Sequence, residues 1–292
     1  MRREPTGLRH RPRHVRLTII PGLLLAMLVT ACGNRNDRSV ALSRPTGSDE
    51  VVVQIMVTGG FVPVGTAVST VPTATVLGDG TVVTAAPVIA IYPGPAITPL
   101  QSVRVPAETV DDLVKRAADL GLLDGVLAFG ESRVADAPDT IVTITVNGTE
   151  HRHVANALRA GGRLDDVGPH LSEHAAANRR ALVSFIAAVE ALPPGEARWE
   201  PSAIAVYALG GYVPDPHLAQ PHREWPLTVE APTAPAAPGE KISCTVIEGE
   251  DVDVLLDVLS KANSRTPWMV GGRAVSLAFR PVVPGQPGCP PR

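Results

Sequence analysis

The chain has 292 residues, of which 45% are hydrophobic, and a formal net charge of −3 at pH 7. That length and apolar content suffice for one large domain or two small ones. Only ten residues are aromatic, three Trp, three Tyr and four Phe, which argues against a carbohydrate-binding groove built from stacked rings.

The first 32 residues carry the most specific pattern in the chain. A basic segment with six Arg precedes an apolar run from Leu17 to Val29, which is short for a membrane span. The run continues into Thr30-Ala31-Cys32, two small residues followed by a cysteine. This pattern resembles the lipobox of bacterial lipoproteins, in which the cysteine receives a diacylglyceryl group and the signal peptide is cut ahead of it.

The resemblance implies a signal peptide over residues 1–31 and lipidation at Cys32. It places the mature protein at the extracytoplasmic face of the cell membrane, held by acyl chains sufficient for stable anchoring. An uncleaved anchor, or a secretory signal with an incidental cysteine, is the alternative. The rest of the chain resembles lipoproteins of high-GC actinobacteria in composition only, since three of its 26 basic residues are Lys.

Cleavage would change the charge of the protein. The first 31 residues hold six Arg and one Glu, so the mature chain keeps 20 basic and 28 acidic side chains, a net charge of −8. We therefore do not expect nucleic acid as a partner. Residues 32–48 are polar and lack an apolar period, which predicts a flexible tether.

The folded part is expected to begin at residue 49, and its first half should be rich in strands. The β-branched run Val51–Val57 predicts a buried strand. The runs Thr73–Leu77 and Thr81–Ala85 flank Gly78-Asp79-Gly80, which predicts a hairpin. Two further strands are predicted, Val88–Tyr92 and Ser102–Val105. A helix should follow Pro106 and stop at Gly121, with apolar residues at helical spacing between them.

Asn147-Gly148 is the strongest short hairpin signal in the sequence. A two-residue turn there pairs Ile144 with His151 and Val142 with His153, so both histidines share one face of the sheet. The sequence adds His170 and His174 near the start of a predicted helix. These four imidazoles could bind zinc if they met. The alternative is that they are ordinary histidines on a sheet and at a helix end.

The helical pattern over 172–192 ends at Pro193-Pro194-Gly195 and marks a candidate boundary. We therefore expect a first half over 49–195, which includes this connecting helix, and a second half over 196–292. Gly59-Gly60-Phe61-Val62-Pro63 returns as Gly210-Gly211-Tyr212-Val213-Pro214, each after an apolar run. Similar strand and helix patterns follow both motifs, which suggests an internal duplication. Two unrelated stretches of similar composition are the alternative.

The chain has three cysteines. Lipidation of Cys32 leaves Cys244 and Cys289 as a pair in an oxidising compartment, which predicts a disulfide between them.

Together these patterns predict an α+β protein with two similar strand-and-helix halves, mostly antiparallel sheets and a connecting helix. Common hydrolase and nucleotide-binding motifs are absent from the sequence. The favoured function is non-catalytic, without a cofactor: binding of an envelope protein or of a small ligand in a groove between the halves. The alternatives are a metal-dependent hydrolase using His151, His153, His170 and His174, and a solute-binding lipoprotein that serves a transporter.

Overall fold

The computed structural model describes residues 41–131, 134–158, 171–232 and 242–289. The predicted signal peptide, Cys32, most of the tether and His170 lie outside these ranges. Within them, no helix combines the length and the apolar character that crossing a membrane requires. The elements follow in this order: β1 (Val51–Gly59), α1 (Val64–Ser69), β2 (Ala74–Leu77), β3 (Thr81–Ala85), β4 (Leu100–Arg104), α2 (Ala107–Asp119), β5 (Pro138–Val146), β6 (Thr149–Asn156), α3 (Glu173–Glu190), β7 (Ala197–Trp199), β8 (Ala203–Gly211), β9 (Arg223–Glu224), β10 (Cys244–Glu248), α4 (Asp251–Ser260), β11 (Trp268–Val270) and β12 (Arg273–Pro281).

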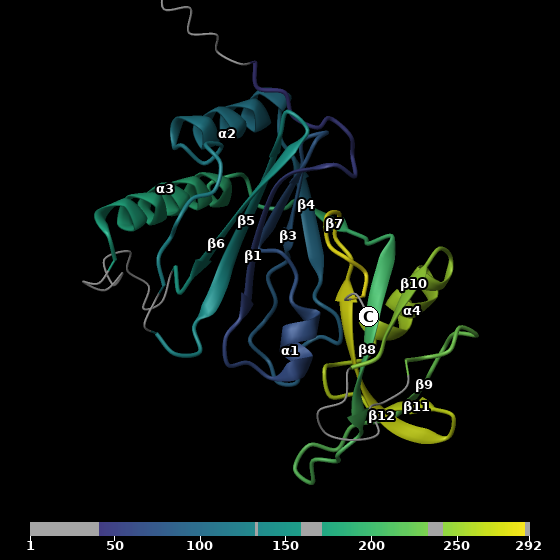
Figure 1. Ribbon diagram of the computed structural model, residues 1–292. Coiled ribbons are helices and arrows are strands. Elements are labelled where there is room, and N and C mark those ends of the chain that lie inside the picture. The colour runs from purple at the N-terminus through teal and green to yellow at the C-terminus, as the bar shows by residue number, and fades with distance from the viewer. Residues whose placement is uncertain (1–40, 132–133, 159–170, 233–241, 290–292) are drawn as a thin grey trace, which may run out of the picture. The chain divides into compact units, whose positions relative to one another are not determined.

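Over the described residues, the first sheet has seven strands in the order β6-β5-β1-β2-β3-β4-β7, and neighbouring strands are antiparallel. Helices α2 and α3 lie together against this sheet (Figure 1). Alternate residues of β5 are buried because successive side chains of a strand point to opposite faces. Val142 and Ile144 therefore pack with Leu113 of α2 and Phe185 of α3 in one core.

The second sheet has five strands over the described residues, in the order β10-β8-β12-β11-β9. Strands β9 and β11 run parallel, and the other neighbours are antiparallel. Helix α4 buries Val252, Leu255 and Leu259, which recur at helical spacing and form one face. This face packs with Trp268 and Phe279 in a second core. The predicted α+β class with two mostly antiparallel sheets is confirmed.

The strand order does not confirm the internal duplication. The proposed correspondence matches β1 with β8, because each leads into the Gly-Gly motif, and β4 with β10, because each precedes a helix of similar sequence. In the second sheet β10 lies beside β8, whereas in the first sheet β2 and β3 separate β4 from β1. Similar local sequence therefore does not produce the same strand neighbours.

One predicted strand is wrong. Residues Val88–Tyr92 form no strand and belong to a loop between β3 and β4. Ile89 has 77% and Tyr92 has 70% of its surface exposed, so these apolar residues lack the packed neighbours that a buried strand needs. Prolines at 87 and 93 flank this run and lack a backbone N–H, so they cannot donate to a strand ladder.

Segments from each sequence half pack against the sheet of the other half. Strand β7 follows α3 in the chain but pairs with β4 of the first sheet. In the other direction, Ile97 forms a bridge with Phe279 of β12, and Val68 of α1 packs beside Tyr207 of β8. The described residues from Ala41 onward consequently form one compact unit.

Residues 282–289, which we call the C-terminal strap, contact both sheets. Val283 is buried among Leu77, Val83 and Leu100 of the first sheet.

At the other end of the strap, Arg280 Nη2 donates hydrogen bonds to the carbonyl oxygens of Pro287 at 2.8 Å and Gly288 at 2.7 Å. The strap ends in the predicted disulfide, in which Cys289 is bonded to Cys244 with the two Cα atoms 5.8 Å apart.

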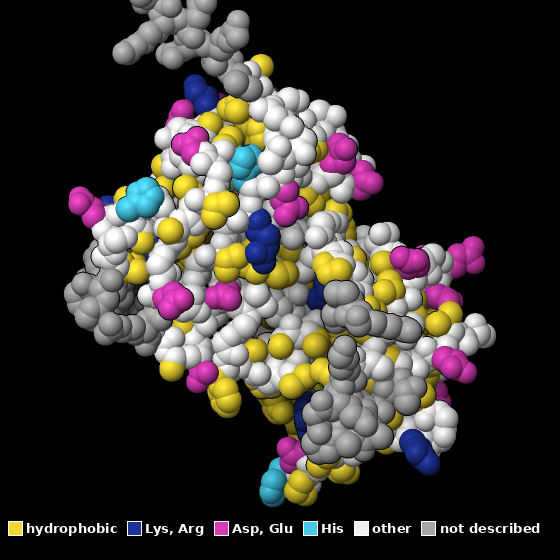
Figure 2. All heavy atoms as spheres, viewed as in Figure 1, with side chains coloured by type: hydrophobic (Ala, Val, Ile, Leu, Met, Phe, Trp, Pro, Cys, Tyr) yellow, Lys and Arg dark blue, Asp and Glu magenta, His cyan; other side chains and the backbone are white. Residues whose placement is uncertain are grey.

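The exposed surface agrees with an acidic protein. Figure 2 shows acidic side chains gathered on the side where α4 lies. Helix α4 carries Asp251 and Asp253 in its first turn. Carboxylates at a helix N-terminus are stabilised by the helix dipole, so their position has a structural explanation.

Candidate functional site

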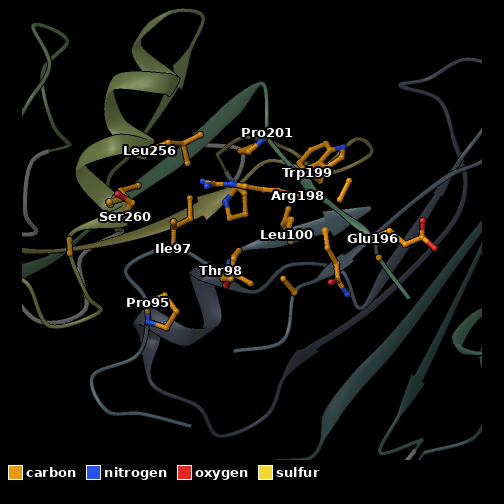
Figure 3. A pocket seen from close by; sticks show the side chains of 18 residues that line it. Pro95, Ile97, Thr98, Leu100, Glu196, Arg198, Trp199, Pro201, Leu256 and Ser260 are labelled. Carbon is orange, nitrogen blue, oxygen red and sulfur yellow. The ribbon is translucent and has the colours of Figure 1, made fainter. Parts of the chain in front are cut away.

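A groove of about 470 Å³ lies between the two sheets. Its walls come from residues 95–101, from β7 with the residues beside it, and from α4 (Figure 3). Most of the lining is apolar, including the side chains of Ile97, Leu100, Trp199, Leu256, Leu259 and Pro281. Grooves of this size and character commonly bind small molecules in proteins.

The local sequence explains why this groove is left open. Pro93, Pro95 and Pro99 prevent a continuous strand, so the segment before β4 forms isolated bridges, from Pro95 to Asn263 and from Ile97 to Phe279, in place of a ladder. Strand β7 has three residues, and Pro201 follows shortly after it. Neither segment therefore fills the space below α4.

Arg198 supplies a cation at the groove. Figure 3 shows its side chain pointing from β7 in the direction of α4, whereas the carboxylate of Glu196 points away. The side chain of Arg198 is 66% exposed, and its Nε lies 3.6 Å from Glu200 Oε1, a loose surface pair. The guanidinium is consequently able to pair with an acidic group on a bound molecule.

Among the described residues that line the groove, no serine or threonine hydroxyl is hydrogen-bonded to a histidine or carboxylate base. Ser260 is the one serine among them, and its hydroxyl donates a hydrogen bond to the carbonyl oxygen of Asp257 at 2.7 Å. No histidine lies in that lining. The groove can therefore hold an apolar molecule with an acidic group.

The structure places the histidines of the predicted hairpin as expected. Asn147 and Gly148 both have positive φ, 53° and 69°, and Ile144 pairs with His151 while Val142 pairs with His153. His153 is buried, with Nε2 2.8 Å from the carbonyl oxygen of Leu122. Because a carbonyl only accepts, this nitrogen must carry the proton.

Burial lowers the pKa of His153 below its usual value. The hydrogen bond to Leu122 opposes this shift, and the nearby His151 adds to it. Phe129 packs edge-on against the imidazole, with ring centroids 5.7 Å apart. This histidine is therefore held neutral, and the ring nitrogen toward Leu122 is already bonded.

The four proposed metal ligands are not brought together among the residues that are described. His174 is exposed on the first turn of α3, and His170 lies outside the described ranges. Over those ranges, no group of three or more His, Cys, Asp or Glu side chains could hold a metal ion. The zinc site remains a prediction, because the position of His170 is not described.

Sequence reasoning missed the lining of the groove and a buried arginine on α3. Arg179 donates from Nε to the carbonyl oxygen of Phe129 at 2.6 Å and from Nη2 to that of Gly130 at 3.2 Å. Burial lowers its pKa. The sequence around Arg179 does not distinguish a buried arginine from an exposed one, because its hydrogen-bond partners lie in a loop about 50 residues earlier in the chain.

Comparison of the chain with protein-family models, with curated proteins and with solved structures gives no match. The function is therefore argued from the geometry of the groove.

Proposed function

We propose that the protein is a lipid-anchored, extracytoplasmic binding protein that holds a small, mainly apolar molecule in the groove between its two sheets. The apolar groove of about 470 Å³ is the observation that carries this proposal. Burial of apolar ligand surface would supply most of the binding free energy, at about 25 cal/mol per Å² before the costs of association. The lipobox-like segment ending at Cys32 supports the location.

The position of Arg198 refines the kind of ligand. A guanidinium at the mouth of an apolar groove favours a molecule with one acidic group at its end. The apolar body would lie along Ile97 and Leu256, with the acid toward Arg198. Binding of this kind needs no chemical step.

Two fluorescent probes that differ by one sulfonate test this proposal. N-phenyl-1-naphthylamine is uncharged, and 8-anilinonaphthalene-1-sulfonate adds one anionic group to the same ring system. We expect purified protein to bind both probes. Ser260→Trp should weaken both by about tenfold or more, because an indole from this exposed position would occupy the groove.

Matched variants complete the experiment. Val254→Trp places the same indole on an exposed part of α4 outside the groove and should leave both affinities unchanged. Arg198→Gln should weaken only the sulfonate probe. Equal binding by Ser260→Trp and Val254→Trp, or no binding of either probe by wild-type protein, would disprove the groove as a binding site.

A further inference from the structure

A second, smaller pocket lies within the second sheet and shares no lining residue with the groove. It has a volume of about 240 Å³, and its described lining combines one cation, four hydroxyl-bearing residues and an apolar wall. The cation is Arg265, and Leu209 and Leu277 form part of the wall. No acidic side chain is among the described residues that line it.

A break in strand pairing forms one side of this pocket. Ser276 pairs with Gly210, but the next residue of β12, Leu277, pairs with Ala208. Leu209 is therefore an extra residue in β8, which makes a β-bulge. Gly210 has a φ of +137°, a conformation that favours glycine, so the sequence accommodates this irregularity. Bulges often occur beside binding sites because they redirect side chains.

A tight turn holds the opposite side of the pocket. Asn263 Oδ1 accepts a hydrogen bond from the backbone N–H of Arg265 at 2.9 Å, and Asn263 N donates to Thr266 Oγ1 at 2.9 Å. The backbone N–H of Thr266 returns to the carbonyl oxygen of Asn263 at 3.0 Å. Because Thr266 Oγ1 accepts a bond from the backbone, its hydroxyl hydrogen stays available as a donor.

Arg265 has a donor without an acceptor. Its Nε is buried and has no hydrogen-bond partner, and Nη2 makes only a long contact of 3.4 Å with the carbonyl oxygen of Val213. No carboxylate in the described chain forms an ion pair with it. A buried N–H without a partner is costly, and a charged group raises that cost. An anion in the pocket would offset part of this cost by pairing with the guanidinium charge.

We propose that this pocket binds a phosphate monoester with a small apolar organic group. A guanidinium and the hydroxyls of Ser264, Thr266 and Ser276 can all donate hydrogen bonds, which suits an oxyanion with three free oxygens. Leu209 and Leu277 would contact the organic group. The inference does not depend on the groove, because the two sites share no residue.

Titration calorimetry with phenyl phosphate, inorganic phosphate and benzoate, at constant ionic strength, tests the proposal on the purified protein. We expect phenyl phosphate to bind more tightly than inorganic phosphate or benzoate. Arg265→Gln should weaken phenyl phosphate by about tenfold or more, since charge-assisted hydrogen bonds are the strong ones. Arg273→Gln removes the same charge from an exposed position on β12 and should change the affinity by less than about twofold.

Other outcomes would overturn the assignment. Benzoate binding as tightly as phenyl phosphate would show a carboxylate site, and equal affinities of wild type and Arg265→Gln would remove Arg265 from the site. Absence of phenyl phosphate binding to folded wild-type protein would refute the pocket itself. If Arg265→Gln fails to fold, Ser264→Ala at an exposed position must weaken phenyl phosphate for the proposal to stand. Ser260→Trp, which blocks the groove, should leave phenyl phosphate binding unchanged.

Discussion

At the scale of single residues, three buried basic side chains bind main-chain carbonyls. His153 bonds to Leu122, Arg179 to Phe129 and Arg280 to Gly288. Each of these carbonyls belongs to a segment outside helices and strands, where no ladder satisfies it. The buried side chains thus complete the hydrogen bonding of loops that pack against the sheets.

The neutral state of His153 predicts an effect of pH on stability. Burial lowers its pKa in the folded protein below the usual value of 6.5, so the unfolded chain binds more protons below that pH. The contribution of His153 is complete above about pH 6.5 and is lost as the pH falls toward the folded pKa. His153→Gln keeps a donor for Leu122 but does not titrate.

Thermal unfolding at several pH values between 7 and 5 checks this prediction. We expect the melting temperature of His153→Gln to fall less steeply with acid than that of wild type. At pH 7 the variant should lose about 0.5–1.5 kcal/mol of stability, because the glutamine fits the site less well. His174→Gln, at an exposed position, is the control and should follow wild type. Parallel curves for all three proteins would contradict the prediction.

At the scale of elements, the C-terminal strap joins the two sheets. Its Pro284 carbonyl accepts a hydrogen bond from Gln54 of β1 at 2.9 Å, and its Val283 enters a cluster of the first sheet. The disulfide fastens the other end to Cys244 at the start of β10. A covalent bond in the second sheet therefore holds a segment that also packs on the first.

Removal of this disulfide should lower the free energy of unfolding. Cys244 and Cys289 are 45 residues apart, and the chain-entropy model gives about 4 kcal/mol for closing such a loop. We expect a combined Cys244→Ser and Cys289→Ser variant to lose about 2–4 kcal/mol in urea unfolding. Wild-type protein treated with a reductant should show the same loss.

Mass spectrometry provides an independent check of the bond. Before reduction, neither Cys244 nor Cys289 should react with an alkylating agent, and both should react afterwards. Alkylation of both residues in unreduced, denatured protein would disprove the bond.

At the scale of the whole molecule, the two sequence halves depend on each other. The groove has walls from the segment before β4, from β7 and from α4, which belong to both halves. Ile97 lines the groove and also forms a bridge with Phe279 of β12. We therefore expect neither 49–195 nor 196–292, expressed alone, to preserve the groove.

The location of the whole molecule is a separate prediction that rests on Cys32. Serine cannot form the thioether that carries the diacylglyceryl group, so Cys32→Ser should leave an unlipidated precursor. Cell fractionation with metabolic labelling by a palmitate analogue tests this. We expect wild type to carry label and Cys32→Ser to carry none. Normal processing and labelling of the variant would show that Cys32 is not the lipidated residue.

Several features could be predicted from the sequence because they depend on local spacing. Asn147-Gly148 determines a two-residue turn, and the turn sets the register that pairs Val142 with His153. If Cys32 is lipidated as predicted, Cys244 and Cys289 leave one pairing, and that bond is present. Apolar residues at strand spacing and at helix spacing also predicted the α+β class, because such spacing depends only on residues close together in the sequence.

Only the tertiary structure decided where remote segments meet. The apolar run Val88–Tyr92 has the composition of a strand, but it has no partner strand and stays exposed. Arg198 and Leu256 line one groove, and Arg265 and Ser276 line one pocket. The packing that brings each pair together cannot be predicted from local sequence patterns. The spacing of residues along the sequence restricts the backbone angles of only a few residues at a time. A binding site requires that segments far apart in the sequence come together. Which segments meet is decided by which sheet edges and faces pack against one another.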